Sequence, residues 1–234
     1  MTKYSIVIPI YNEEDNIEKL VKEIFYYLGK FKNSFEILII DDGSEDNSLS
    51  LIKRLSTQYK NIYCYTNGNN KGQSYSIFFG IKKSKSDTII TLDGDGQNNP
   101  KDILKLIKIY EQDNNLALLG GIRIKRKDSL IKIMSSRLAN FIRKLILNDN
   151  CDDTGCSLKI FDRKTFLKIP FFDGLHRFLP ALFSGLGKKT LFINVDHRSR
   201  VYGVSKYATI DRLLRGIRDL IKVKKILKDL KKSD

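Results

Sequence analysis

The chain has 234 residues, of which 41% are hydrophobic and 29% are charged, a composition typical of a soluble globular protein with a substantial core. It contains no apolar stretch near the roughly 20 residues that span a bilayer, and no signal peptide is expected. Three scattered cysteines are too few for a disulfide framework and are typical of the reducing cytoplasm. The formal net charge of +15 favours an anionic partner.

The first half of the chain alternates between short apolar runs and amphipathic patterns. We expect Asn12 to cap the first helix and Ser44 to cap the second. The expected strands cover residues 4–10, 35–40, 61–66, 87–92 and 116–121, and the expected helices begin near residues 12, 44, 71 and 100. Such alternation predicts an α/β fold with a parallel sheet covered by helices on both faces. Ligands bind beyond the carboxyl ends of the strands in sheets of this kind.

Polar segments follow four of these strands. They are Tyr11–Glu13, Asp41–Ser44, Asn67–Gly72 and Asp93–Gln97. Because the carboxyl ends of parallel strands share one edge of the sheet, the four segments predict a single site. No glycine fingerprint of dinucleotide-binding proteins follows the first strand and no P-loop lysine occurs, which argues against those classes.

The fourth segment carries the most specific chemistry. In an extended chain Asp93 and Asp95 point to the same side, and Gly94 allows a large ligand to approach the backbone. Carboxylate and amide oxygens suit Mg2+ or Mn2+, which complete their coordination with phosphate oxygens. A simple turn is the alternative. A calcium loop is excluded because Asn98 and Leu104 occupy positions that require glycine and an acid.

The second half is less regular. We expect a basic helix at about residues 129–147, a turn and strand over 152–161, a helix over 175–186, a strand over 189–195 and a basic loop over 197–206. Residues 1–211 are expected to form one catalytic domain, followed by a basic amphipathic helix over 212–234. This helix could lie on anionic lipid or pack against its own domain, and periodicity does not distinguish the two.

Five segments resemble family 2 glycosyltransferases of the GT-A fold, in the branch of the dolichyl-phosphate mannose synthases and bacterial polyprenyl-phosphate glycosyltransferases. They are Ile8–Glu13, Ile39–Ser44, Leu92–Pro100, Asp153–Lys159 and His197–Lys206. They span nearly the whole chain in the family's order. The resemblance implies a Rossmann-like, mostly parallel sheet and the inverting transfer of mannose or a similar hexose from a nucleotide sugar to a polyprenyl phosphate.

The resemblance also implies roles for individual residues. The GDP- or UDP-sugar donor would contact Pro9, Tyr11, Glu13, Ile39, Asp41, Asp93, Gly94, Arg123 and Lys206. Mg2+ or Mn2+ would be held by Asp95 and Gln97, and the acceptor phosphate by Arg137, Arg200 and His197. The catalytic set would comprise Asp93, Asp95, Asp153 and Arg200.

Asp153 has no single assignment from the sequence. Relatives that act on hydroxyl acceptors use an acid near this place as general base, but a prenyl phosphate is already an anionic nucleophile. Asp153 would then orient a cation or the donor sugar, or cap the following element. A peripheral position on the cytoplasmic face of the membrane follows from the lipid acceptor, with an anionic membrane surface or a membrane protein as the partner.

Three other functions remain to be separated from this one. A family 2 enzyme acting on a saccharide or other hydroxyl acceptor in envelope glycan synthesis would need Asp153 as a base. A nucleic-acid-binding module would explain the charge but not the carboxylates, which repel phosphates, and we expect no nucleic-acid partner. A non-catalytic GT-A scaffold would not need Asp93, Asp95 and Gln97.

Overall fold

The computed structural model describes residues 2–31, 34–124, 142–147, 149–199 and 209–233, with side chains of the last helix described from Arg218 to Leu230. The strands are β1 (Tyr4–Ile10), β2 (Phe35–Asp41), β3 (Ile62–Thr66), β4 (Thr88–Thr91), β5 (Leu116–Arg123), β6 (Lys159–Asp162) and β7 (Lys189–Val195). The helices are α1 (Glu14–Leu28), η1 (Gly29–Phe31), α2 (Ser48–Gln58), α3 (Gln73–Lys83), α4 (Lys101–Glu111), α6 (Arg163–Leu167), α7 (Leu175–Gly185) and α8 (Thr209–Ser233).

The strands form one seven-stranded sheet in the order β3-β2-β1-β4-β6-β5-β7. The pairs β1–β2, β1–β4, β2–β3 and β5–β7 are parallel, whereas β6 runs antiparallel to both β4 and β5. The predicted mostly parallel sheet is therefore confirmed. Because β6 comes from the second half of the chain, it brings residues near 153–159 beside the end of β4.

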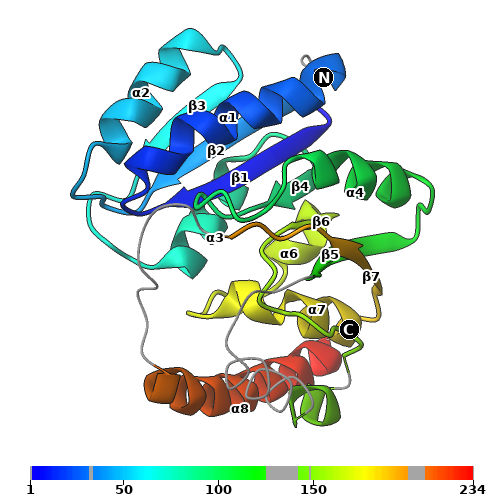
Figure 1. Cartoon of the computed structure of the whole chain (residues 1–234). Coiled ribbons are helices and arrows are strands. Elements are labelled where there is room, and N and C mark those ends of the chain that lie inside the picture. Colours follow the sequence, from blue (N-terminus) through cyan, green and yellow to red (C-terminus); the bar gives the residue numbers. More distant parts are fainter. Residues whose placement is uncertain (1, 32–33, 125–141, 148, 200–208, 234) are drawn as a thin grey trace.

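Helices cover both faces of this sheet, as predicted (Figure 1). The first core contains the apolar faces of α1, α2 and α4, with residues such as Ile24, Ile52 and Ile103 fully buried. The second core contains α3, α6, α7 and α8. Since each strand sends alternate side chains to opposite faces, Ile6 belongs to the first core and Val7 to the second.

The two predicted helix caps are wrong. Helix α1 begins after Glu13 and α2 after Asn47, and neither residue makes a side-chain capping bond. Asn12 has a positive φ of 52°, its N–H donates to Ser44 Oγ at 3.0 Å, and its Oδ1 accepts from the Glu45 N–H at 2.8 Å. Asn12 and Ser44 therefore tie the loop after β1 to the loop after β2, which fixes the two sides of the site relative to one another.

Helix α8 packs part of its apolar surface on its own domain. Val223 is fully buried in the second core, and Leu220, Ile226 and Leu227 pack against it. Asp219 forms an ion pair of 2.7 Å with Arg177 of α7, while Ile221 is 68% exposed. These residues of α8 therefore pack against the protein's own domain. No helix within the described ranges is long and apolar enough to cross a membrane.

Candidate functional site

A cavity of about 170 Å³ lies where the strand-end loops meet. Its lining comes from all four polar segments that follow β1 to β4: Pro9, Ile10, Tyr11, Glu13, Asp42, Asn70, Gly72, Gln73, Asp93, Gly94 and Asp95. Four acidic side chains are among them. The cavity can therefore bind cations or the hydrogen-bond donor groups of a polar ligand. A cation must offset the negative charge of these acids before a phosphate group can bind there.

Asp93 is the most strongly perturbed acid of the cavity. Burial, together with the neighbouring carboxylate of Asp95, raises the pKa of Asp93 to about 6, against the opposing effects of Ser157, Lys159 and Arg123. The Gln73 side-chain amide donates to Asp93 Oδ1 at 2.6 Å, and the Asp93 N–H donates to Ser157 Oγ at 3.1 Å. Gln73 thus holds the carboxylate and Ser157 holds the backbone of Asp93, from elements distant in sequence.

The loop after β3 is fastened by Asp42. The Asp42 carboxylate accepts from the N–H groups of Lys71 and Gly72 at 2.9 and 2.8 Å and from Asn67 Nδ2 at 2.7 Å. Gly72 adopts a φ of 87°, which favours glycine, and it delivers Gln73 to the start of α3. Asp42 therefore shapes the cavity wall as well as lining it.

Asp41 and Ile39 lie elsewhere. Asp41 is 1% exposed and accepts from the N–H groups of Gly43 and Ser44 and from Thr66 Oγ1. Ile39 is buried in the first core. Neither lines the cavity, because Asp41 closes the turn after β2 and the Ile39 side chain is part of the first core.

Arg123 and Asp153 form a bidentate ion pair close to Asp93. Arg123 Nε and Nη2 donate to the two carboxylate oxygens of Asp153 at 2.7 and 2.8 Å, and the Arg123 N–H adds a third bond at 3.1 Å. The side chains are 17% and 8% exposed. Asp153 is thus paired with a cation, and which of the roles left open by the sequence it plays in the reaction stays a prediction. Arg123 does not line the cavity and instead acts on Asp93 through its charge.

Gln97 and His197 meet beside the cavity. Their Nε2 atoms are 3.5 Å apart, Gln97 Nε2 lies 3.4 Å from the Arg198 carbonyl oxygen, and Gln97 O accepts from the Arg198 N–H at 2.9 Å. The segment after β7 therefore lies against the end of the β4 loop. Gln97 does not line the cavity, and the remaining predicted cations, Arg137, Arg200 and Lys206, lie outside the described residues.

The cavity's acids suit a divalent cation that takes few protein ligands. Among the described residues no group of three His, Cys, Asp or Glu side chains is arranged as a complete metal site. However, Asp93 and Asp95 line the same cavity, and burial followed by the charge of Asp95 raises the pKa of Asp93. Mg2+ and Mn2+ bind through one or two carboxylates plus substrate phosphates, so Asp93 and Asp95 fit them.

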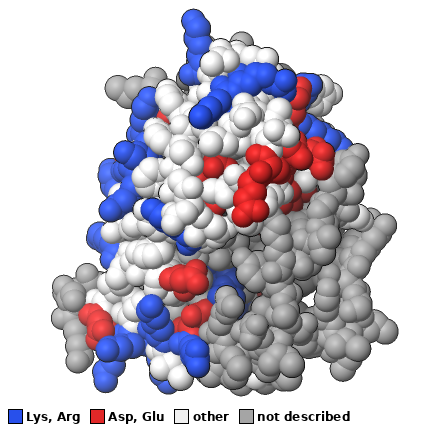
Figure 2. All heavy atoms as spheres, turned by 90° about the vertical axis from the view of Figure 1, so that its left-hand side faces the viewer, with Lys and Arg blue, Asp and Glu red and all other residues white. Residues whose placement is uncertain are grey.

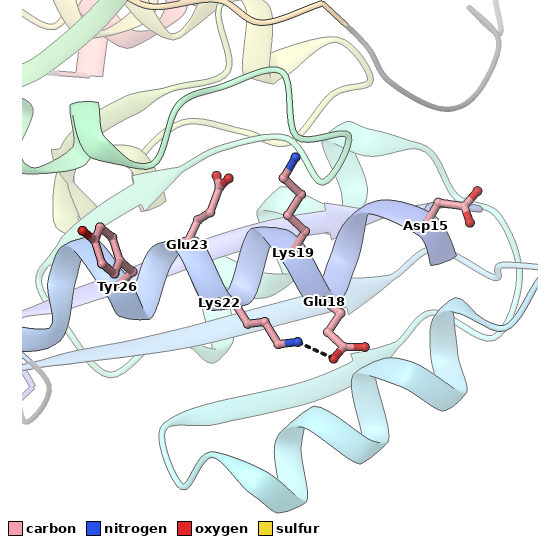
Figure 3. Close-up of a pocket in the computed structure, with 6 residues that line it drawn as sticks. All are labelled: Asp15, Glu18, Lys19, Lys22, Glu23 and Tyr26. Atoms are coloured by element: carbon pink, nitrogen blue, oxygen red, sulfur yellow. Dashed lines mark ion pairs between the residues drawn. The ribbon is translucent and has the colours of Figure 1, made fainter.

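A larger hollow of about 710 Å³ lies over the outer face of α1 (Figure 3). Asp15, Glu18, Lys19, Lys22, Glu23 and Tyr26 line it. All six come from one helix, and Glu18 pairs with Lys22 at 2.8 Å on that surface. The hollow is a space between long solvated side chains, and the strand-end cavity is the better candidate site because four loops converge there.

Sequence reasoning missed several residues at this site. Asp42, Asn70, Gly72 and Gln73 line the cavity, and Ser157 supports Asp93. The polar segment Asn67–Gly72 pointed to the third loop, and the second acid of the Asp41–Asp42 pair was an available alternative to the first. Gln73 gave no local signal, since it begins α3 and resembles an ordinary helix residue.

The comparisons with known proteins agree with this arrangement. The model of the family "Glycosyl transferase family 2" matches residues 5–169. Undecaprenyl-phosphate 4-deoxy-4-formamido-L-arabinose transferase of Pectobacterium atrosepticum is 31% identical over 93% of this chain and 66% of its own length. Dodecaprenyl-phosphate galacturonate synthase of Rhizobium johnstonii is 34% identical over 94% of this chain and 65% of its length. The chain thus spans slightly less than two thirds of these relatives.

Two solved structures share the fold at low sequence identity. Glucosyl-3-phosphoglycerate synthase from Mycobacterium tuberculosis, in complex with Mn2+, UDP-glucose and phosphoglyceric acid, has a TM-score of 0.69 at 14% identity, covering 97% of this chain and 80% of that one. A mannosyltransferase from Pyrobaculum calidifontis, in complex with GDP-mannose and Mn2+, has a TM-score of 0.66 at 14% identity over 97% and 68%. The chain therefore belongs to glycosyl transferase family 2 and has the GT-A fold.

Proposed function

We propose that the protein transfers a sugar from a nucleotide-sugar donor to a polyprenyl phosphate. The acidic cavity formed by the four strand-end loops is the observation that carries this proposal. The relatives from Pectobacterium and Rhizobium, a transferase and a synthase named for prenyl phosphates that match over nine tenths of this chain, support the acceptor. Family membership supports glycosyl transfer itself.

The donor binds in the cavity. Of the residues that line it, Pro9, Tyr11 and Glu13 contact the base and ribose, and Gln73 and Asp93 contact the sugar side. When bound, Mg2+ or Mn2+ at Asp95 neutralises the negative charge that develops on the departing nucleoside diphosphate. Structures of the same fold solved with UDP-glucose and Mn2+, or with GDP-mannose and Mn2+, support either kind of donor.

The acceptor phosphate attacks the anomeric carbon from the side opposite to the leaving diphosphate, so the configuration inverts. Two anions must approach one another for this, and cationic side chains lower the cost. We assign this task to Arg123, His197 and, from the sequence, to Arg137, Arg200 and Lys206. Gln97 supports the site through its contacts with the segment after β7.

Asp153 acts through Arg123 in this proposal. Both of its oxygens already accept bonds from the guanidinium, so the carboxylate is poorly placed to remove a proton from an acceptor. A prenyl phosphate needs no such proton removal, whereas a hydroxyl acceptor does. The ion pair therefore favours the phosphate acceptor over a saccharide acceptor.

The finer features follow from the acceptor. A lipid phosphate resides in a membrane, which places the enzyme peripherally, on the cytoplasmic face where nucleotide sugars are made. A hexose such as mannose is our first choice of sugar, by the resemblance of the sequence to dolichyl-phosphate mannose synthases.

Transfer into lipid tests the proposal. The purified protein, Mg2+ or Mn2+ and undecaprenyl phosphate are incubated with radiolabelled GDP- and UDP-sugars in turn, and label in the organic phase is counted. We expect metal-dependent label with one donor, absent from Asp95→Ala and retained in Asp15→Ala, which removes an exposed acid of α1. Metal-dependent donor breakdown without lipid label would reject the lipid acceptor.

A further inference from the structure

One face of α3 carries aromatic rings with lysine side chains above them, and this face extends away from the cavity. The face comprises Tyr75, Phe78, Phe79 and Lys82, which are spaced as neighbours on one side of a helix, and is flanked by Lys71 and Phe171. We call these six residues the α3 ridge. Gly72 and Gln73, which line the cavity, come directly between Lys71 and Tyr75 in the chain, so the ridge begins at the cavity's edge.

The rings of the ridge contact one another and remain accessible. The Phe171 ring lies 5.0 Å from that of Phe78 and 6.0 Å from that of Tyr75, and Tyr75 stacks on Phe79 at 6.3 Å. Phe171 is 42% exposed, and the three rings of α3 are half-buried. A cluster of apolar rings at the surface is a feature of interaction sites.

Lysines place positive charge over these rings. Lys71 Nζ lies 4.8 Å from the centroid of Tyr75, and Lys82 Nζ lies 5.1 Å from that of Phe78, both within cation–π range. Both lysines are exposed. The adjoining helix α8 continues the basic character, since exposed Lys222 lies 5.4 Å from the ring of Phe172, next to Phe171.

Exposed acids lie both beside the ridge, as Asp173 does, and far from it. Figure 2 shows a large group of Asp and Glu side chains in the upper part of one face of the molecule, smaller groups lower down, and Lys and Arg side chains near both. Exposed acids such as Asp15 and Glu45 belong to the start of α1 and the loop before α2. The exposed lysines of the ridge, Lys71 and Lys82, supply the positive charge that is complementary to an anionic surface.

We propose that the α3 ridge docks on an anionic phospholipid bilayer and thereby holds the cavity next to membrane-embedded acceptor. Aromatic rings favour the membrane–water interface, and lysines beside them bind anionic headgroups. The inference deepens the proposed function by naming the surface that meets the membrane. Vesicle binding needs neither donor nor acceptor, so its outcome is separate from that of the transfer assay.

The test compares two double variants of the full chain in vesicle co-sedimentation. Phe171→Ser/Lys82→Gln removes one ring and one charge from the ridge, and Tyr26→Ser/Lys19→Gln removes the same kinds of group from α1, where Tyr26 is 81% exposed. Vesicles contain phosphatidylcholine with or without phosphatidylglycerol. We expect the wild type to bind the anionic vesicles in a salt-sensitive manner. Binding should fall tenfold or more in the ridge variant, because one lysine near the membrane contributes about fivefold to vesicle affinity and the ring contributes the rest. In the control variant, binding should change by less than about twofold.

A second variant guards against misfolding. Lys82→Gln/Lys83→Gln changes only exposed side chains and should still lower anionic-vesicle binding more than tenfold. Transfer to a short, water-soluble prenyl phosphate should stay unchanged in each ridge variant, while transfer to acceptor in vesicles falls. Equal vesicle binding by ridge and control variants would overturn the proposal. It would also be overturned if the wild-type protein does not bind vesicles but self-associates through these residues.

Discussion

Arg123 and Asp153 are joined by three hydrogen bonds of 2.7 to 3.1 Å, two from the arginine side chain and one from its backbone N–H. These bonds tie the end of β5 to the turn before β6. The pair lies close enough to Asp93 for the Arg123 charge to oppose the rise in the pKa of that carboxyl. In the proposed function, the acid that the sequence offered as a base instead holds the Arg123 guanidinium close to Asp93.

Breaking this pair should cost stability in a way that reveals the partnership. Asp153→Asn leaves the Arg123 guanidinium largely buried without its counter-charge, and we expect the free energy of unfolding to fall by about 3 kcal/mol. We expect the double variant Arg123→Gln/Asp153→Asn to lose about 1–3 kcal/mol less free energy of unfolding than the sum of the losses in the two single variants. Urea unfolding measures both. Asp152→Asn, which alters an exposed neighbour paired with Lys144, should change stability by less than about 0.5 kcal/mol. Strict additivity of the two buried changes would refute the coupling.

Asp95 should matter for metal more than for folding. We expect Asp95→Asn to lower kcat/KM for transfer by about 10²- to 10³-fold, because the charge on the leaving diphosphate loses its stabilisation. Mn2+ titration followed by electron paramagnetic resonance, in the presence of nucleoside diphosphate, should show weakened binding. Asp15→Asn, which changes an exposed acid on α1, is the matched control. Unchanged Mn2+ affinity in Asp95→Asn would place the metal elsewhere.

Gln73 should control the orientation of Asp93. Its amide donates to the carboxylate at 2.6 Å, and hydrogen bonds to charged groups contribute about 1.5–3 kcal/mol. We therefore expect Gln73→Ala to lower kcat/KM by tenfold or more, while Gln58→Ala at the exposed end of α2 has no effect. Steady-state kinetics at saturating metal decides the matter. Wild-type kinetics in Gln73→Ala would show that the bond does not position Asp93 during the reaction.

His176 should make stability fall in mild acid. Burial, assisted by Arg177 and Lys159, lowers the pKa of His176 from 6.5 to about 3, and Nδ1 lies 2.7 Å from Ser74 Oγ. Below pH 6.5 the unfolded chain takes up a proton that the native state refuses, so this stability is present above pH 6.5 and is lost as the pH falls towards 3. Between pH 7.5 and 5.5 His176 should account for about 1.4 kcal/mol of lost stability.

Urea unfolding of the wild type and His176→Gln at these two pH values tests this. The carboxylates contribute equally to both proteins, so the difference between their pH slopes isolates the histidine. The variant should lose less stability than the wild type on acidification. Identical slopes would mean that His176 has the same pKa in the native and unfolded states.

Much of the fold could be predicted because its signals are local. The strands over residues 4–10 and 189–195 were predicted with the bounds that the structure gives, since each is a continuous apolar or alternating run with clear ends. The convergence of four polar loops followed from the parallel sheet alone. The antiparallel direction of β6 and its place between β4 and β5 depend on pairing across some 70 residues, which no local pattern encodes.

The site was harder to predict at the level of single side chains. Asn12 and Ser44 have the composition of helix caps, yet they bond to one another's loops. Asp41 and Asp42 are adjacent acids, and only the turn geometry decides which one reaches the cavity. The contact of Gln73 with Asp93 arises where α3 meets the end of β4, and such tertiary contacts have no signature in either segment.

The nature of the acceptor tests the central claim most directly. We would compare transfer of one active donor's sugar to undecaprenyl phosphate and to undecaprenol, which presents a hydroxyl on the same lipid, under identical metal and detergent conditions. The account predicts that only the phosphate is glycosylated and that the product is a phosphodiester by mass spectrometry. Transfer to undecaprenol at a comparable rate, or to a saccharide while both lipids remain unlabelled, would contradict it.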